Sequence, residues 1–203
     1  MKALYVTERR AISDERFEGV LESLEGAPLL TVQLREKETA DRQTLAWAAA
    51  ARRALGPDVP LYVNRRFDLA LAAGAVGVHL PSDGLPLPRV RANTPRGFRV
   101  GVSTHSAAGA AEAISGGADL VVIGPVFSTP SKASFGEPLG PEALADLPPA
   151  REHGSEVFAI GGISEENLNM LEPYRDRISG VAGIRLFQEA SDPGAVARRI
   201  AQR

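Results

Sequence analysis

The sequence contains no cysteine, few aromatic residues (5%) and no excess of charge of either sign, with a formal net charge of −2. Without cysteine, disulfides and thiolate metal sites are excluded, which fits a reducing compartment. The near-neutral balance gives no reason to expect nucleic acid or a membrane surface as a partner. No apolar run approaches the ~20 residues that span a bilayer, and the N-terminus lacks the apolar core of a signal peptide. We therefore expect a cytoplasmic protein.

Eight short apolar runs are present, and segments with helical patterns separate them. The runs are apolar without alternation, which is typical of parallel strands covered on both faces. They span residues 3–7, 28–35, 60–64, 75–80, 97–103, 119–124, 156–162 and 178–184, and the clearest helices are expected over 39–55, 106–117 and 193–203. Eight such units in 203 residues predict a single (β/α)8 barrel over residues 1–203. A doubly wound open sheet is the alternative, but its usual phosphate-binding glycines after the first strand are missing.

Polar residues and glycines gather where six of these runs end. In a barrel the carboxyl ends of the strands meet at one mouth, where active sites lie. Any one of these side chains alone is more often a solvated loop residue. Their coincidence predicts a cation-rich site in which the hydroxyls and the lysine of 129–132 bind phosphate. The residues are Gln33, Arg35, Lys37, Asn64, Arg65, Arg66, Ser103, His105, Thr129, Ser131, Lys132, Gly161, Gly162, Gly183 and Arg185.

Two glycine motifs, "AIGGI" (159–163) and "VAGI" (181–184), end the last two predicted strands. Bare backbone N–H groups there, with a helix expected to start near Ser164, would form an anion site in the usual phosphate position of the fold. The alternative is that these glycines only turn the chain. We predict that a phosphate binds the N–H groups of Gly162 and Gly183, with Gly161 and Ile184 completing the site.

The stretch "PLYVNRRFD" (60–68) places two arginines directly after a buried strand. Carboxylates, in contrast, are scarce at the predicted mouth, because Asp83 lies among turn residues and Asp68 belongs to the next helix. Magnesium requires oxygen ligands, carboxylates above all. We therefore predict no metal site and no cofactor.

Seven motifs in this order resemble the thiamin phosphate synthase/TenI family, and the resemblance covers nearly the whole chain. It implies a (β/α)8 barrel that binds a small phosphorylated thiazole or thiamin phosphate, with a homo-oligomer left open. In the synthase branch an aminopyrimidine diphosphate loses pyrophosphate, and magnesium binds this leaving group. A thiazole phosphate then attacks the resulting carbocation. The motifs are "QLREK", "VNRRFDLAL", "GVHLPSD", "GVSTHS", "GPVFSTPSK", "AIGGI" and "VAGI".

The resemblance also implies roles for individual residues. The glycine motifs match the thiazole phosphate site of the synthases. The synthases have Asn-Asp where this chain has Asn64-Arg65, and Gly-Gln-Glu-Asp where it has "PSDG" (81–84). Both missing aspartates bind magnesium, so we expect Arg65 to supply part of that positive charge. The matches to pyrimidine and pyrophosphate contacts are Gln33, Arg35, Lys37, Asn64, Ser103, Thr129, Ser131 and Lys132.

Three functions remain open. "LPS" (80–82) resembles the TenI branch, whose members isomerise a thiazole phosphate by proton transfer, and this metal-independent reaction is our first hypothesis. The branch's catalytic histidine is Pro125 here, so His105 is the candidate base, and His79 is expected to pack. The other two hypotheses are a synthase, which would use magnesium, and a non-catalytic binder of thiamin phosphates.

Overall fold

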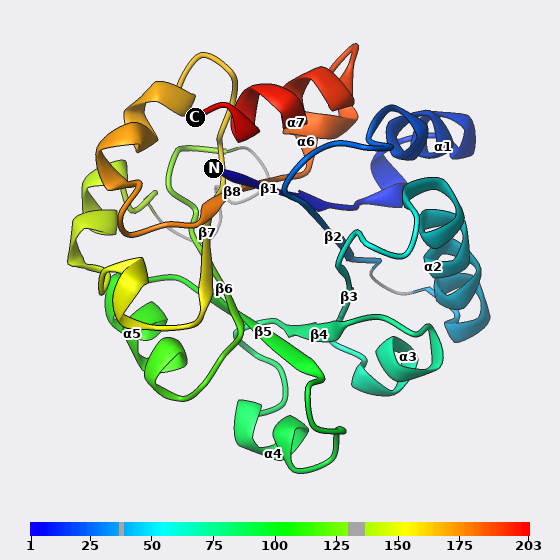
Figure 1. Ribbon diagram of the computed structural model, residues 1–203, viewed down its shortest axis with the longest axis horizontal. Helices are drawn as coiled ribbons and strands as arrows, with labels where there is room; N and C mark the ends of the chain where they lie inside the picture. The colour runs from blue at the N-terminus through cyan, green and yellow to red at the C-terminus, as the bar shows by residue number, and fades with distance from the viewer. Residues whose placement is uncertain (37–38, 130–136) are drawn as a thin grey trace.

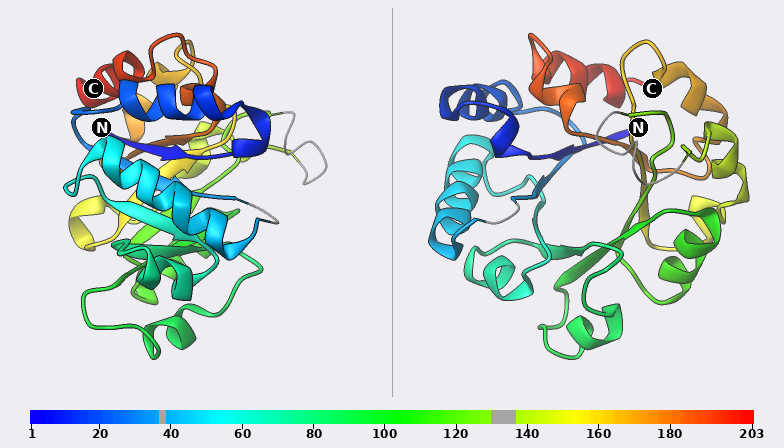
Figure 2. Two further views of the ribbon diagram at one scale, coloured as in Figure 1. Left: turned by 90° about the vertical axis from the view of Figure 1, so that its right-hand side faces the viewer. Right: turned by 180° about the vertical axis from the view of Figure 1, so that it is seen from behind.

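The computed structural model describes residues 1–36, 39–129 and 137–203 and shows a closed barrel of eight parallel strands in chain order. Each strand pairs with the next, and β8 closes the ring against β1 (Figure 1). The helical segments form an outer ring, which the view from behind also shows (Figure 2). The predicted (β/α)8 fold is therefore confirmed. The strands are β1 (Lys2–Val6), β2 (Leu30–Leu34), β3 (Leu61–Asn64), β4 (Gly77–Leu80), β5 (Arg99–Thr104), β6 (Leu120–Ile123), β7 (Glu156–Ile160) and β8 (Gly180–Gly183).

The outer ring changes character along the chain. After β6 and β7 it consists of 3-10 helices, because prolines such as Pro173, which lies inside η5, interrupt regular α-helix. The α-helices are α1 (Asp14–Ser23), α2 (Asp41–Leu55), α3 (Phe67–Ala72), α4 (Leu87–Arg91), α5 (Ala107–Ser115), α6 (Arg185–Gln188) and α7 (Pro193–Ala201). The 3-10 helices are η1 (Arg9–Ala11), η3 (Pro141–Asp146), η4 (Ala150–Glu152) and η5 (Leu168–Tyr174).

All eight predicted strands exist, but several are shorter than their apolar runs. The run over 28–35 starts to pair only at Leu30, because Leu29 has a left-handed φ of 53°. The run over 156–162 stops at Ile160, because Gly161 and Gly162 have φ of 100° and 64°. Backbone with positive φ cannot continue a strand, so backbone conformation and not hydrophobicity sets these ends.

The helix expected to start near Ser164 was predicted wrongly. The Asn167 side chain accepts a hydrogen bond from the Ser164 backbone N–H at 2.9 Å and donates to the Gly162 carbonyl at 2.8 Å. These two bonds hold residues 162–167 in a turn, and η5 begins only at Leu168. No helix N-terminus at Ser164 therefore contributes to an anion site.

Two apolar clusters fill the molecule. The larger one lies between the strands and the outer helices. The smaller one comes from alternate positions of the strands and fills the barrel interior, with Phe158 fully buried at its centre. Both termini lie at the same end of the barrel, and the Met1 amino group donates to the Ile200 carbonyl at 3.2 Å. No helix in the described ranges is long and apolar enough to cross a membrane.

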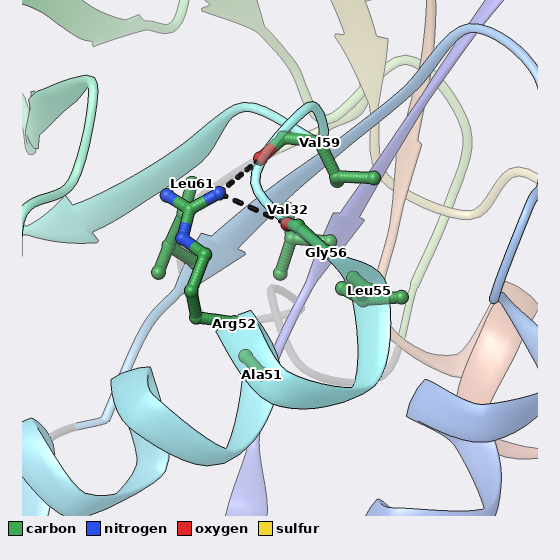
Figure 3. Close-up of a pocket in the computed structure, with 7 residues that line it drawn as sticks. All are labelled: Val32, Ala51, Arg52, Leu55, Gly56, Val59 and Leu61. Carbon is green, nitrogen blue, oxygen red and sulfur yellow. Dashed lines mark hydrogen bonds between the residues drawn. The ribbon is translucent and has the colours of Figure 1, made fainter.

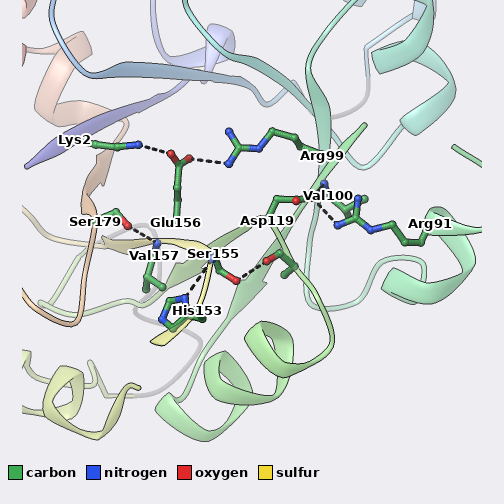
Figure 4. Close-up of polar contacts among 11 residues, drawn as sticks. Lys2, Arg91, Arg99, Val100, Asp119, His153, Ser155, Glu156, Val157 and Ser179 are labelled. Carbon is green, nitrogen blue, oxygen red and sulfur yellow. Dashed lines mark hydrogen bonds and ion pairs between the residues drawn. The ribbon is translucent and has the colours of Figure 1, made fainter. Parts of the chain in front are cut away.

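Ion pairs link neighbouring strands at the end of the barrel where the strands start. Glu156 at the start of β7 contacts the ammonium of Lys2 and lies 3.4 Å from the guanidinium of Arg99 (Figure 4). Only 18% of the Glu156 side chain is exposed. Nearby, Asp119 accepts hydrogen bonds from Arg91 and from the Val100 backbone N–H. Ion pairs at this lower end of a barrel serve stability and not catalysis, because the active site lies at the opposite end.

We expect Glu156→Gln to lower the free energy of unfolding by about 1–3 kcal/mol, because it leaves two partly buried cations without a counter-charge. Urea denaturation measures the effect. The matched control is Glu165→Gln, which removes a carboxylate from an exposed pair with Arg199 and should cost at most about 0.5 kcal/mol. Equal losses in the two variants would contradict the assigned role.

A hollow lies at this same lower end, between the last turn of α2 and β3 (Figure 3). The guanidinium of Arg52 spans it and donates to the carbonyls of Gly56 at 3.3 Å and Val59 at 2.8 Å. The remaining space does not admit a water molecule. The hollow is therefore a packing feature and not a ligand site.

Candidate active site

Four polar side chains from neighbouring strands form a row just inside the mouth, which we call the polar row (Gln33, Asn64, His79 and Ser103). The Gln33 amide donates to Asn64 Oδ1 at 3.2 Å, and His79 Nε2 lies 2.8 Å from Ser103 Oγ. Asn64 and His79 are register partners in β3 and β4. Gln33 and His79 are almost fully buried. The predicted contacts Gln33, Asn64 and Ser103 are thus brought together, and they are neutral.

The protonation of His79 follows from its surroundings. Burial, and secondarily the positive charge of Arg35, lower the pKa of His79 to about 3. Its Nδ1 is buried beside Gly101 and has no hydrogen-bond partner in the described part of the chain. A proton on Nδ1 would be an unpaired buried donor, so Nε2 carries it and donates to Ser103. The Ser103 hydroxyl proton is then available to a ligand, and the expected packing role of His79 extends to orienting this hydroxyl.

The stability of the fold should depend on His79 below neutral pH. The unfolded chain protonates this residue near pH 6.5, whereas the folded chain resists protonation down to about pH 3. Its stabilising contribution is therefore complete above pH 6.5 and is lost as the pH falls toward 3. Between pH 7 and pH 5 we expect His79 to lower the free energy of unfolding by about 2 kcal/mol. Urea denaturation at pH 7 and at pH 5 measures the loss of unfolding free energy between the two values. This loss should be smaller in His79→Gln than in the wild type by that amount, and equal losses would contradict the assignment.

The glycine motifs meet on the opposite side of the mouth, after β7 and β8. Gly161 and Gly162 adopt left-handed backbone, and a Cβ on Gly162 would lie 2.4 Å from the Ser128 carbonyl oxygen. The loops after β6 and β7 therefore approach each other closely, which by itself requires glycine. Gly183 ends β8, and Ile184 precedes the first turn of α6. Phosphate binding by these backbones stays a prediction.

Most of the described arginines at the mouth already have acidic partners. Arg65 Nη2 contacts Asp83 Oδ1 at 2.7 Å, and Arg66 contacts both Asp41 at 2.8 Å and Asp68 at 2.6 Å. Arg35 is only loosely paired, with Nη1 3.6 Å from Glu8 Oε1. That Nη1 is buried and has no hydrogen-bond partner among the described residues, so Arg35 is less fully paired than Arg65 and Arg66.

Arg185 follows β8 and contributes a positive charge at the mouth. Its position could be predicted from the sequence, but its binding partner could not. Its Nη2 donates to Thr129 Oγ1 at 2.8 Å, across 56 positions of sequence. No carboxylate among the described residues lies within ion-pair distance of it. The contact brings together the loop after β6 and the end of β8. Of the predicted contacts, Lys37, Ser131 and Lys132 lie outside the described residues.

His105 follows β5 and is exposed. Its Nδ1 lies 2.6 Å from the Gly124 carbonyl oxygen, and its Nε2 lies 3.3 Å from Ser82 Oγ. Because a carbonyl only accepts hydrogen bonds, Nδ1 carries the proton and Nε2 presents a lone pair. His105 and Ser82 line a cleft of about 420 Å³ between the loops after β4 and β5, with apolar walls that include Leu85 and Val102. This is the arrangement that a general base requires.

Comparison with known proteins agrees with this arrangement of elements. The profile of the family described as "Thiamine monophosphate synthase" matches residues 3–187. The chain belongs to this family. It is 38% identical over 205 residues to the thiamine-phosphate synthase of Syntrophomonas wolfei, covering 98% of this chain and 95% of that one. The Roseiflexus thiamine-phosphate synthase is 35% identical, covering 96% and 81%. The structure of the Pyrococcus furiosus thiamine phosphate pyrophosphorylase superposes with a TM-score of 0.80 at 26% identity, covering 99% and 94%.

The residues of this family member do not fit the magnesium ion that the resemblance implies. Arg65 stands at one ligand position, and its guanidinium is bonded to the carboxylate of Asp83. Within residues 1–36, 39–129 and 137–203, no group of three or more His, Asp or Glu could hold a metal ion. From its position in the sequence we expected Arg65 to offer its positive charge to a ligand. Its guanidinium is instead paired with the Asp83 carboxylate.

Proposed function

We propose that this chain catalyses the thiamine-phosphate synthase reaction, with side-chain cations and without a metal at the leaving group. The observation that carries the proposal is the separation of charge at the mouth. The polar row is neutral, since even its histidine has a pKa near 3. The positive charges of Arg35 and Arg185 lie at the rim. The names of relatives that match nearly the whole chain also support it.

This separation suits the chemistry. The C–O bond between the pyrimidine methylene and the diphosphate breaks, and its electron pair leaves with the diphosphate. The lone pair of the thiazole nitrogen then forms the new C–N bond. The polar row itself adds no positive charge beside the carbocation, whereas the departing diphosphate is stabilised by the guanidinium groups at the rim. Gln33 and Asn64 would hold the aminopyrimidine ring through its polar edge.

The test incubates the protein with the aminopyrimidine diphosphate and the thiazole phosphate and quantifies thiamin phosphate and pyrophosphate. We expect equal amounts of both products, formed at similar rates with magnesium and with excess EDTA. Absence of thiamin phosphate under both conditions would refute the proposal. Turnover that requires magnesium would refute its metal-free part only.

A second candidate is isomerisation of a thiazole phosphate by proton transfer, and the geometry of His105 favours it. An imidazole with its Nδ1 fixed by a backbone carbonyl and its Nε2 facing a ligand-sized cleft can take and return a proton. Tight binding of thiamin phosphate without either reaction would instead favour a non-catalytic binder.

A further inference from the structure

Arg185 combines features that a solvent-facing arginine rarely has. It starts α6, a short helix anchored by Leu186 and Phe187, which are 9% and 0% exposed. A Cβ on Gly183 would lie 2.7 Å from Leu186 Cβ, so the turn before Arg185 is tightly packed. The guanidinium therefore extends from a fixed base and not from a loose loop.

The partner of Arg185 is a buried hydroxyl in the loop after β6, and this contact holds the guanidinium in place. Thr129 is buried, at 8% exposed, and its Oγ1 accepts the Arg185 hydrogen bond at 2.8 Å. The remaining N–H groups of Arg185 face no carboxylate of the described chain within ion-pair distance, in contrast to Arg65 and Arg66.

We propose that Arg185, held by Thr129, is a charged ligand for the phosphate monoester of the bound substrate. It lies two positions after Gly183, so it joins the backbone site expected there to the loop after β6. A planar guanidinium forms paired hydrogen bonds to phosphate oxygens, whereas backbone N–H groups supply only dipoles. Arg185 would therefore determine the preference for phosphorylated over unphosphorylated ligands. The inference rests on the proposed phosphate-binding function.

The experiment is calorimetric titration of the full chain with thiamin phosphate and, separately, with thiamin. We expect Arg185→Gln to weaken thiamin phosphate binding by about 10–100-fold, as for the loss of charge-assisted hydrogen bonds, and to leave thiamin binding within twofold. Arg185→Lys should recover part of the loss, because it restores the charge without the planar fork. Arg53→Gln makes the same charge change on α2 near the other end of the barrel, and both affinities should stay at the wild-type values.

Three results would overturn the inference. Unchanged thiamin phosphate affinity in Arg185→Gln would show that Arg185 does not contact the phosphate and would leave the proposed function standing. An equal loss for thiamin and thiamin phosphate would show a structural role. Failure of the wild-type protein to bind thiamin phosphate at all would overturn both this inference and the proposed function.

Discussion

Replacing Gln33 with leucine should lower kcat/KM for the aminopyrimidine diphosphate by about 10²–10³-fold, while the protein stays folded. Gln33 is 4% exposed and donates one N–H to Asn64 Oδ1. Its carbonyl oxygen and second N–H would serve as an acceptor and donor pair for a ligand at the mouth. An aminopyrimidine edge offers the complementary donor and ring nitrogen acceptor. Leucine keeps the volume but removes both hydrogen bonds and leaves Asn64 without its donor.

The measurement is initial-rate kinetics with each substrate varied in turn. KM for the thiazole phosphate should change little, because that substrate is expected on the opposite side of the mouth. Gln202→Leu, the same substitution at an exposed position in the last turn of the chain, is the matched control and should behave as wild type. A loss below threefold in Gln33→Leu would exclude Gln33 from ring recognition.

Isomerisation of the thiazole phosphate should depend on His105. We expect His105→Ala to lower that rate by about 10²–10⁴-fold, the usual contribution of a general acid or base, and to leave thiamin phosphate affinity nearly unchanged. The reason is geometric, since Nε2 faces the cleft while Nδ1 is held by Gly124.

Two comparisons make the His105 experiment decisive. Ser82→Ala removes the hydroxyl next to Nε2 but keeps the imidazole, so it should cost far less than His105→Ala. Synthase turnover should fall less than threefold in both variants, because bond formation at the thiazole nitrogen needs no proton transfer at this residue. A drop in isomerisation below threefold in His105→Ala would show that His105 is not the base.

The barrel could be predicted from the sequence because its signals are local. Eight apolar runs without alternation require burial on both faces, and only a parallel sheet covered by helices provides it. The strand ends depend on the backbone conformation of single residues, such as the left-handed Leu29. The hydrophobic pattern of the sequence does not predict these conformations. The turn at 162–167 was missed for the same reason, since Asn167 bonds back to the chain in place of starting a helix.

The candidate site was only partly predictable. Strand ends identify which residues reach the mouth, but not how charges pair across it. The partner of Arg65 is a residue 18 positions away, and that of Arg185 is 56 positions away. Both pairings depend on the closed ring and have no local signal. The sequence therefore indicated a cation-rich mouth, and the described part of the structure distinguishes Arg185, which has no carboxylate there within ion-pair distance, from the arginines that are neutralised.

The pairing of β8 with β1 has a consequence for the order in which the protein becomes active. The ring-recognising residues come from β2 to β5, whereas Gly183 and Arg185 belong to the last strand and the residues after it. During translation all residues of the polar row are synthesised before Arg185, since Ser103 and Arg185 are 82 positions apart. A nascent chain thus carries half a binding site. Affinity for a phosphorylated ligand would appear only when β8 docks against β1, which makes such a ligand a probe of barrel closure.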